Sequence, residues 1–296
     1  MIAETTVMRG RFGWRLAAFY ELTKPGVNLL VVLTSAAGFY LGSTTGLDFW
    51  LFLHTLAGTV LLGGGAAVFN EFIEREADGK MRRTCKRPLP SGRLKARDAA
   101  VFGGVLIVSG SLYLALLTNL LAACLGMATA VIYLLIYTPL KTRTSICMAI
   151  GAIPGAMPPL IGWAAARGHL DFQAWILFGI LFAWQFPHFL SIAWIYKEDY
   201  KRAGFIMLPP TDLDGRKTCG KILGFTILLL SLSVIPVTSG LSGTVYLIGA
   251  VLLGAAFLWY GFEVALRRST ASARNVLLAS VAYLPLLLIL MVIDKK

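Results

Sequence analysis

Residues 98–118 read DAAVFGGVLIVSGSLYLALLT, an apolar run whose single charged side chain, Asp98, stands at its start. A helix of about 20 such residues is long enough to cross the hydrocarbon core of a bilayer. Comparable runs recur along the chain and give nine predicted spans, approximately 25–43, 49–72, 98–118, 120–138, 146–166, 172–195, 219–238, 243–264 and 275–293. The sequence therefore predicts an all-α, polytopic membrane protein with about nine transmembrane helices. We expect a single transmembrane domain over 25–296, preceded by an N-terminal segment over 1–24.

The composition of the whole chain suits a bilayer better than water. It is 57% hydrophobic and 14% charged, with a mean hydropathy of +0.74, whereas soluble domains carry about 25% charged residues. A net charge of +12 could indicate nucleic acid in a soluble protein. Here the distribution of the charge points to a lipid bilayer, so we predict no nucleic-acid partner. The four cysteines show no metal-type spacing and receive no role.

The basic residues lie almost entirely on one side of the predicted bundle. Of 27 Lys and Arg residues, 24 fall in the N-terminal segment and in the loops after spans 2, 4, 6 and 8. Basic loops remain in the cytoplasm. This rule places the N-terminus and the two long loops, roughly 73–97 and 196–218, in the cytoplasm of an inner (plasma) membrane protein, with the C-terminus outside. The other side holds Arg167, Lys295 and Lys296.

Asn70, Glu74 and Asp78 stand four residues apart at the end of the second span. In a helix this spacing keeps the three side chains on one face. Mg²⁺ prefers one or two carboxylates together with water and substrate phosphate oxygens. Polar residues at the edge of the membrane are costly and tend to be functional. The pattern therefore predicts an Mg²⁺ site that a diphosphate completes.

Cationic side chains accompany these acids in the sequence. Arg and Lys pair with phosphate oxygens, and Arg does so through two hydrogen bonds at once. The positive-inside rule explains the charges but not the acids interleaved with them. The candidate phosphate-side residues are Arg82, Arg83, Arg87, Lys141 and Arg143, with Tyr137 as a substrate-lining neighbour of Lys141.

The second long loop carries another acidic and basic cluster, Glu198-Asp199-Tyr200-Lys201. By its position after an even-numbered span, we expect it to face the first loop across the bundle. Asp199 is the better candidate for a second metal ligand, with Glu198 behind it. Tyr200 and Lys201 are candidates for substrate binding.

Four segments together resemble the signatures of the UbiA prenyltransferase superfamily, and of its haem-farnesylating branch in particular. They are Asn70–Asp78 with the following Met81-x-Arg83-Thr84-x₂-Arg87-Pro88-Leu89, the stretch Gly151–Trp163 ending in Pro-Pro-Leu-x-Gly-Trp, Trp184-Gln185-x-Pro187-His188-Phe189, and Asp199-Tyr200-x₂-Ala-Gly-x₂-Met-Leu-Pro. The family pattern has Asp where this chain has Glu74. The resemblance assigns His188 to a haem site.

The resemblance also implies a reaction. A farnesyl group would pass from farnesyl diphosphate to the vinyl group of haem b, giving haem O, in a UbiA-like bundle. Mg²⁺ would assist ionisation of the diphosphate, with Asn70, Glu74, Asp78, Asp199 and Lys141 as the catalytic residues. We expect the carbocation-like farnesyl chain in an apolar chamber lined by aromatic residues such as Phe69, Trp163 or Trp184. A haem A synthase or an oxidase assembly factor is the expected protein partner.

Three other functions remain open from the sequence alone. The acceptor of the same chemistry could be an aromatic ring, although the Pro-Pro-Leu-x-Gly-Trp and Trp-Gln-x-Pro-His stretches argue against it. A transporter would need acidic residues near the middle of the membrane, whereas these acids gather at one face. A haem-binding protein without catalysis would bind haem and release no diphosphate.

Overall fold

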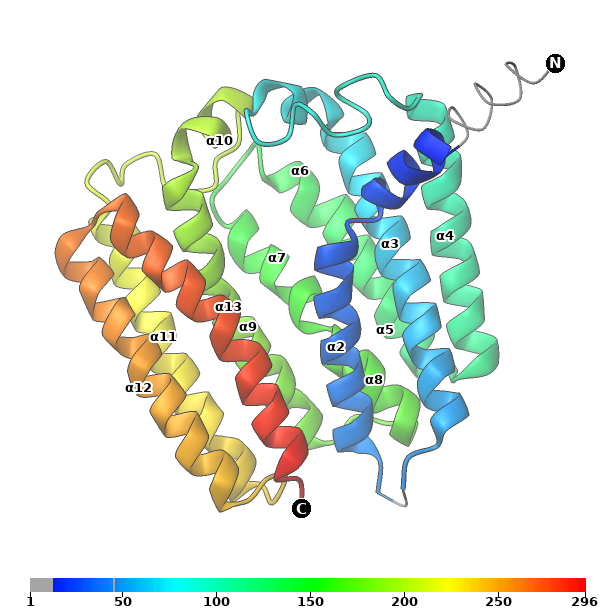
Figure 1. Ribbon diagram of the computed structural model, residues 1–296, viewed down its shortest axis with the longest axis vertical. Helices are drawn as coiled ribbons and strands as arrows, with labels where there is room; N and C mark the ends of the chain where they lie inside the picture. Colours follow the sequence, from blue (N-terminus) through cyan, green and yellow to red (C-terminus); the bar gives the residue numbers. More distant parts are fainter. Residues whose placement is uncertain (1–12, 45) are drawn as a thin grey trace.

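The computed structural model describes residues 13–44 and 46–296, and every named element in this part of the chain is a helix (Figure 1). The helices are α2 (Pro25–Gly42), α3 (Phe49–Lys80), α4 (Ala96–Leu117), α5 (Leu120–Val131), the π-helix η1 (Ile132–Tyr137), α6 (Thr138–Leu140), α7 (Cys147–Ala156), α8 (Pro158–Arg167), α9 (Phe172–Ile195), α10 (Lys197–Ala203), α11 (Arg216–Thr238), α12 (Thr244–Arg267) and α13 (Thr270–Ile293). Of the predicted segment 1–24, residues 13–22 are helical, while 1–12, with Arg9 and Arg11, lie outside the described residues.

The predicted membrane spans are confirmed. Within the described residues, nine helical segments are long and apolar enough to cross a membrane, and they correspond one to one with the predicted runs. The largest difference is at α3, which continues to Lys80 instead of ending near residue 72. Its 32 residues rise about 48 Å, well beyond a hydrocarbon core of about 30 Å. The last turns of α3, which carry its acidic residues, therefore extend past the hydrocarbon core.

Two of the spans are interrupted. The fourth consists of α5, η1 and α6, with the π-helical turns over Ile132–Tyr137. The fifth breaks at Met157 between α7 and α8, where Pro158 and Pro159 begin the new helix, because proline fits a first turn, where its missing N–H is not needed. By contrast, α7 contains Pro154, and α9 continues as one helix past Pro187.

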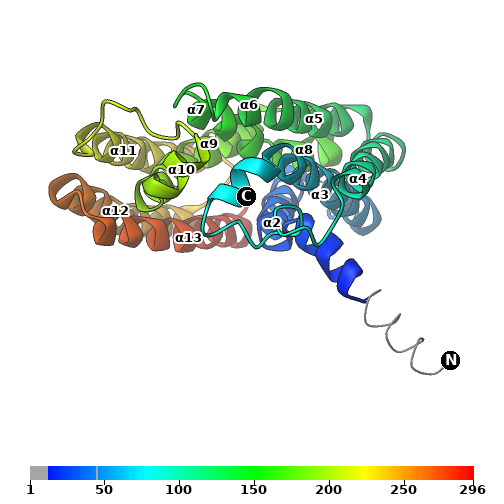
Figure 2. The ribbon, with the colours of Figure 1, turned by 90° about the horizontal axis from the view of Figure 1, so that it is seen from above.

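The bundle has two distinct ends. Residues 81–95 and 196–215, with α10, cover one end, which we call the loop end; it lies at the top of Figure 1. The other end, the turn end, has the short connections 43–48, 118–119, 168–171 and 239–243 and the C-terminus. Seen from above, α5, α6 and α7 lie along one side of the molecule, and α12, α13 and α2 along the other (Figure 2).

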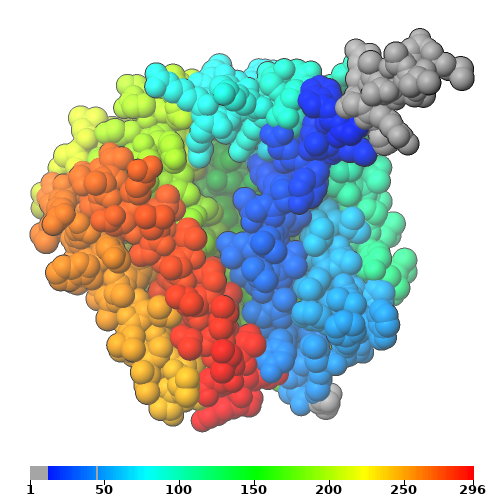
Figure 3. Space-filling model, viewed as in Figure 1, coloured from blue at the N-terminus to red at the C-terminus, as the bar shows by residue number. Residues whose placement is uncertain are grey.

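Small residues bring α2 and α8 into close contact. A Cβ atom on Gly38 would overlap the Pro159 carbonyl oxygen, and one on Gly162 would overlap the Ser35 carbonyl oxygen. Such close approach replaces the hydrophobic effect as a source of helix association in lipid. By contrast, the seam between α2 and α13 is looser, and a hollow separates the two helices on the face that Figure 3 shows.

Candidate functional site

The C-terminal turns of α3 present a polar face to the interior of the loop end. Asn70, Glu74 and Asp78 are 2%, 7% and 1% exposed, and all three line one cavity of about 130 Å³. The predicted common face is therefore confirmed. Glu71, one residue further round the helix, is also buried and was not among the predicted site residues. Charged groups are rarely buried without partners, so these carboxylates have to be neutralised by their neighbours.

The π-helix η1 supplies the next wall of the cavity. Tyr133 and Tyr137 stack, with ring centroids 5.6 Å apart, and both line the cavity. The Thr138 hydroxyl donates to the Tyr133 carbonyl oxygen and accepts from the Asn70 side-chain amide. π-Helical turns occur frequently at functional sites. Here the turn joins the end of span 4 to the polar face of α3.

Lys141 follows this turn and pairs with Glu74. Its ammonium nitrogen lies 2.6 Å from Glu74 Oε1 and 4.6 Å from the centroid of the Tyr137 ring. Burial acts to lower the pKa of Lys141, but the Glu74 carboxylate opposes it more strongly and the pKa lies above its ordinary value. Lys141 is therefore a fixed positive charge. Tyr137, Lys141 and the acidic face of α3 thus line one cavity.

The loop after α3 folds back so that Arg87 lies over the same acids. Arg87 Nη1 donates to Asp78 Oδ2 at 2.8 Å, and Arg87 Nε lies 3.5 Å from Glu71 Oε1. The turn is held by the Thr84 hydroxyl, which donates to the Asp78 carbonyl oxygen. Burial lowers the pKa of Arg87, yet Asp78 and Glu71 together raise it above its usual range.

The second long loop meets the first, as predicted. The Arg83 guanidinium lies 5.2 and 4.7 Å from the ring centroids of Tyr196 and Tyr200. The amide of Ile206 donates to the Lys141 carbonyl oxygen at 2.6 Å. These contacts bring Tyr200, and with it Phe205 and Met207, to the wall of the cavity.

Lys24 is a site residue that sequence reasoning missed. Its ammonium group donates to Asn70 Oδ1 at 2.8 Å and lies 3.9 Å from Glu71 Oε1. The residue has a φ of +48°, one of two positive values among the described non-glycine residues, and such a conformation costs free energy. Burial lowers the pKa of Lys24 to about 8, and the nearby Arg87 acts in the same direction. The sequence feature that could have identified Lys24 is its position directly before Pro25, at the edge of the first span.

The other predicted residues of the second loop and of the basic run lie outside the cavity. Asp199 is buried in α10 and forms an ion pair with Arg202. The exposed residues are Arg82, Arg143, Glu198 and Lys201. Their predicted roles in binding substrate or metal stay predictions. Arg83, also exposed, does line the cavity.

His188 lies apart from this cavity, between α9 and α13. Its ring stacks on Trp184 with centroids 4.8 Å apart, and its Nδ1 lies 2.8 Å from the Ser280 hydroxyl. That hydroxyl donates its only proton to the Leu277 carbonyl oxygen. His188 Nδ1 must then be the donor, so the lone pair of the neutral ring is at Nε2. This tautomer is suited to metal binding through Nε2, one of the two nitrogens through which a neutral imidazole ligates metals.

The expected aromatic lining is not found at the cavity. Phe69 packs toward Gly103 of α4, Trp163 donates to Asp171 near the turn end, and Trp184 donates to the Ser280 carbonyl oxygen. The aromatic side chains at the cavity are Tyr133, Tyr137, Tyr200 and Phe205. The predicted place of Phe69, Trp163 and Trp184 in an apolar chamber around the farnesyl chain stays a prediction.

The buried acids suit a hard divalent cation. Among the described residues, Asp78 Oδ1 and Glu71 Oε2 are buried and have no hydrogen-bond donor. Buried polar atoms are nearly always paired, so an additional positively charged partner fits these oxygens. No three His, Cys, Asp or Glu side chains in the described ranges converge as a complete metal site. The donor set therefore fits Mg²⁺, which takes few protein ligands and several from water and phosphate.

Similarity to characterised proteins agrees with this geometry. The model of the UbiA prenyltransferase family matches residues 31–285. A protoheme IX farnesyltransferase of Solibacter usitatus is 48% identical over 286 residues, covering 94% of this chain and 98% of that one. One of Koribacter versatilis is 44% identical over 290 residues, covering 95% and 94%.

Solved structures share the fold at low sequence identity. A digeranylgeranylglyceryl phosphate synthase is 20% identical, with a TM-score of 0.80 and coverage of 95% of this chain and 98% of that chain. A UbiA homologue from Archaeoglobus fulgidus, bound to DMAPP and Mg²⁺, is 15% identical, with a TM-score of 0.68 and coverage of 92% and 98%. The fold and the site thus define a polytopic membrane enzyme of the prenyltransferase class. The chain belongs to the UbiA prenyltransferase family.

Proposed function

We propose that this chain transfers the farnesyl group of farnesyl diphosphate to a vinyl group of haem b, giving haem O. The observation that carries the chemistry is the cavity at the loop end, where buried carboxylates stand among four cations, of which Lys141 is buried. The choice of acceptor is supported by relatives of 44% and 48% identity, aligned over nearly their whole length, that are protoheme IX farnesyltransferases. These relatives weigh against an aromatic acceptor and against transport.

The cations of the cavity are placed to bind the diphosphate. Arg83, Arg87 and Lys141 line it together with Lys24. Guanidinium and ammonium groups stabilise the negative charge that develops when the bond between C1 of farnesyl and the diphosphate oxygen breaks and the oxygen keeps the electron pair. Lys141 and Arg87 now hold Glu74 and Asp78. We infer that they divide their hydrogen bonds between these acids and the phosphate oxygens.

Glu74 and Asp78, with the amide oxygen of Asn70, are the proposed protein ligands of Mg²⁺. The support is their common buried face and the oxygen of Asp78 that has no donor among the described residues. When bound, Mg²⁺ supplies further neutralisation of the leaving diphosphate. Asp199, with Glu198 behind it, stays the candidate for a second metal position; a change of partner from Arg202 would be required.

The rings of Tyr137 and Phe205 lie near the Lys141 ammonium, at 4.6 and 5.7 Å. A ring face that attracts one cation can attract another. We propose that these rings stand next to the allylic end of the substrate and exclude water from the developing carbocation. The vinyl group of haem b then attacks C1, and water adds to the resulting cation and releases one proton, which the departed diphosphate can accept, to complete the hydroxyethylfarnesyl substituent.

We also propose that the loop end faces the cytoplasm of an inner (plasma) membrane and that the C-terminus lies outside. The support is the basic bias, since 24 of 27 Lys and Arg residues belong to the N-terminal segment and the loops at that end. A haem A synthase or an oxidase assembly factor remains the predicted partner that takes the product.

Reconstitution tests the proposed reaction. The purified protein in liposomes would be incubated with haem b, farnesyl diphosphate and Mg²⁺, with EDTA as the control, and haem mass and diphosphate release would be followed. We expect an Mg²⁺-dependent product heavier than haem b by a farnesyl group plus a hydroxyl group. Diphosphate release with an aromatic acceptor and not with haem would move the protein to another branch of the family.

A further inference from the structure

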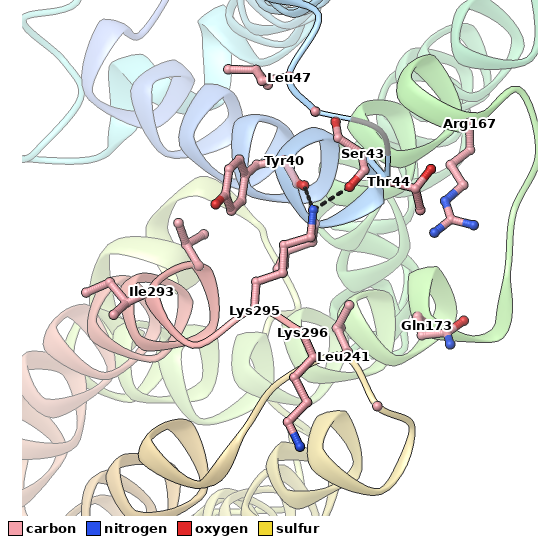
Figure 4. A pocket seen from close by; sticks show the side chains of 14 residues that line it. Tyr40, Ser43, Thr44, Leu47, Arg167, Gln173, Leu241, Ile293, Lys295 and Lys296 are labelled. Atoms are coloured by element: carbon pink, nitrogen blue, oxygen red, sulfur yellow. Dashed lines mark hydrogen bonds between the residues drawn. The ribbon is translucent and has the colours of Figure 1, made fainter.

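A second cavity, of about 570 Å³, lies at the turn end, and it collects the basic residues of that side (Figure 4). Arg167, Lys295 and Lys296 all line it. These are the three Lys and Arg residues that the charge bias places outside the cytoplasm. They come from α8 and from the segment after α13, more than 120 positions apart in the sequence. We call this cavity, which is lined by these three cations, the outer pocket.

The chain that carries Lys295 and Lys296 is held in place by the backbone. The amide of Gly243 donates to the Asp294 carbonyl oxygen at 2.9 Å, and the amide of Lys296 donates to the Leu241 carbonyl oxygen at 3.3 Å. The Asp294 carboxylate accepts from the amide of Tyr246. Terminal residues are usually poorly ordered unless they are tied down. Here the ties fix both lysines at the outer pocket.

The positive charge of the outer pocket is only partly neutralised. Lys295 Nζ donates to the carbonyl oxygens of Tyr40 and Ser43, both at 2.5 Å, at the C-terminal end of α2 (Figure 4). Arg167 pairs with Asp171 at 3.1 Å. Among the described residues, no carboxylate lies within ion-pair distance of the lysine side chains at 295 and 296. Burial and the proximity of Arg167 lower the pKa of Lys295. The three cations gathered at one cavity are the feature that would attract an anion.

An apolar groove continues from the outer pocket along the seam between α2 and α13. It has a volume of about 400 Å³, and all its lining side chains except Tyr40 are hydrocarbon. The outer pocket and the groove share Tyr40, Leu47, Val292 and Ile293. Leu33 and Ile289 on its walls are 51% and 53% exposed, so the groove opens on the outside of the bundle, where the bilayer lies. It follows part of the seam seen in Figure 3.

We propose that the outer pocket and this groove bind one anionic phospholipid, with the headgroup phosphate at Lys295 and Lys296 and an acyl chain between α2 and α13. Charge complementarity selects an anionic head, and the apolar continuation selects a molecule with a chain. The site is distinct from the diphosphate cavity, because the 18 residues of α2 separate the two ends by about 27 Å. The bound lipid would join α2, α8 and α13 at the turn end, where the seam between α2 and α13 is otherwise loose.

Lipid retention by the purified, delipidated full-length protein tests this site. Phosphatidylglycerol and phosphatidylcholine with identical chains would be titrated in detergent, and bound lipid counted by native mass spectrometry. We expect preferential binding of phosphatidylglycerol. In Lys295→Gln/Lys296→Gln, affinity should fall about 30-fold, because each cation near an anionic lipid contributes roughly a five-fold factor. Gln keeps a donor for the α2 carbonyl oxygens, so folding should persist.

Three comparisons separate the site from general charge effects. Lys217→Gln/Lys221→Gln, a matched double change of exposed lysines at the loop end, should leave phosphatidylglycerol affinity unchanged. Lys295→Arg/Lys296→Arg should keep the binding. Ala36→Phe, which fills the groove without changing charge, should weaken the binding of the lipid but not of inorganic phosphate.

Several outcomes would overturn the proposal. The first is equal binding of phosphatidylglycerol and phosphatidylcholine, and the second is an equal loss of affinity in the loop-end control variant. The third is that inorganic phosphate displaces the lipid completely in competition. The fourth is that the pocket variant selectively loses binding of haem b and keeps binding of phosphatidylglycerol. The last result would assign the cations to the carboxylates of haem.

Discussion

At the residue scale, the proposed site depends on buried carboxylates at the end of α3. Asp78 is 1% exposed, has one oxygen bound to Arg87 and has another without a donor among the described residues. Glu76, two residues earlier on α3, has an 85% exposed side chain and pairs with Arg75 alone. The two acids therefore share a helix turn but not an environment, and they make a matched pair for mutagenesis.

We expect Asp78→Asn to lower kcat/KM by about 10²- to 10³-fold, the usual effect of removing one group that stabilises transition-state charge. Glu76→Gln should leave kcat/KM nearly unchanged. The measurement is farnesyl transfer at saturating and limiting Mg²⁺, with the apparent unfolding midpoint in detergent as a check of folding. Wild-type activity in Asp78→Asn would remove this residue from the proposed metal site.

His188 is the second residue whose role can be isolated. Because Nδ1 donates to Ser280, Nε2 carries the lone pair that could ligate haem iron. We expect His188→Ala to change the absorption spectrum of bound reduced haem b. His54→Ala is the control, since His54 bonds Tyr113 between α3 and α4. An unchanged spectrum in His188→Ala would leave the residue only its packing role against Trp184 and Ser280.

At the scale of elements, glycines set the distance between α2 and α8. In Gly162→Ala the new methyl would overlap the Ser35 carbonyl oxygen and lie 2.7 Å from the Phe39 nitrogen, both backbone atoms that cannot turn away. We expect a loss of about 1–3 kcal/mol, typical of overpacking, seen as a lower unfolding midpoint. Gly224→Ala, on α11 with nothing within 4 Å of the added Cβ, should not lower it. Equal midpoints for the two variants would contradict the close contact.

The start of α11 is held by Asp212. Its carboxylate accepts from the Lys217 amide, the Thr218 amide and the Thr218 hydroxyl at 2.9, 2.7 and 2.5 Å. Burial acts to raise the pKa of Asp212, but these hydrogen bonds outweigh it and the pKa lies below its ordinary value.

The pKa of an Asp carboxyl group is about 4 in the unfolded chain. Because the pKa of Asp212 is lower in the folded state, its ionised carboxylate stabilises the fold above about pH 4. This stabilisation is lost as the pH falls through the pKa of the folded state. We therefore expect Asp212→Asn to lower the unfolding midpoint at pH 7, with the difference from wild type shrinking as the pH falls below about 4. Asp214→Asn, which removes the charge of a 65% exposed side chain, is the control. A difference that persists unchanged in acid would show that the hydrogen bonds do not depend on ionisation.

At the scale of the whole molecule, the distribution of Lys and Arg predicts which end faces the cytoplasm. The four cysteines allow a direct check, because Cys85 lies in the loop after α3, Cys124 is exposed on the membrane span formed by α5, and Cys147 and Cys219 are buried. A membrane-impermeant thiol reagent should label Cys85 in inverted vesicles and not in intact spheroplasts. Cys85→Ser should abolish the label. Labelling from outside would reverse the proposed orientation.

The membrane spans and the polar face of α3 could be predicted because both depend on local spacing. Apolar runs of about 20 residues determine where spans lie, and a four-residue interval puts Asn70, Glu74 and Asp78 on one face of any helix. The pairing of Tyr137 with Lys141 is local for the same reason. Asp199 shows the limit of this reasoning, since its position in the second loop did not indicate that Arg202 on its own helix would be its partner.

The sequence by itself determined the polytopic helical class, the basic bias of one side and the acidic face at the end of the second span, because hydropathy, charge and helical period are properties of short segments. Only the tertiary structure decided that Lys24 meets Asn70 and that Arg87 lies between Glu71 and Asp78. It alone also decided that Arg167 and Lys295 share the outer pocket. Such contacts depend on how helices distant in sequence cross one another, and packing of small residues such as Gly38 and Gly162, rather than any local pattern, sets those crossings.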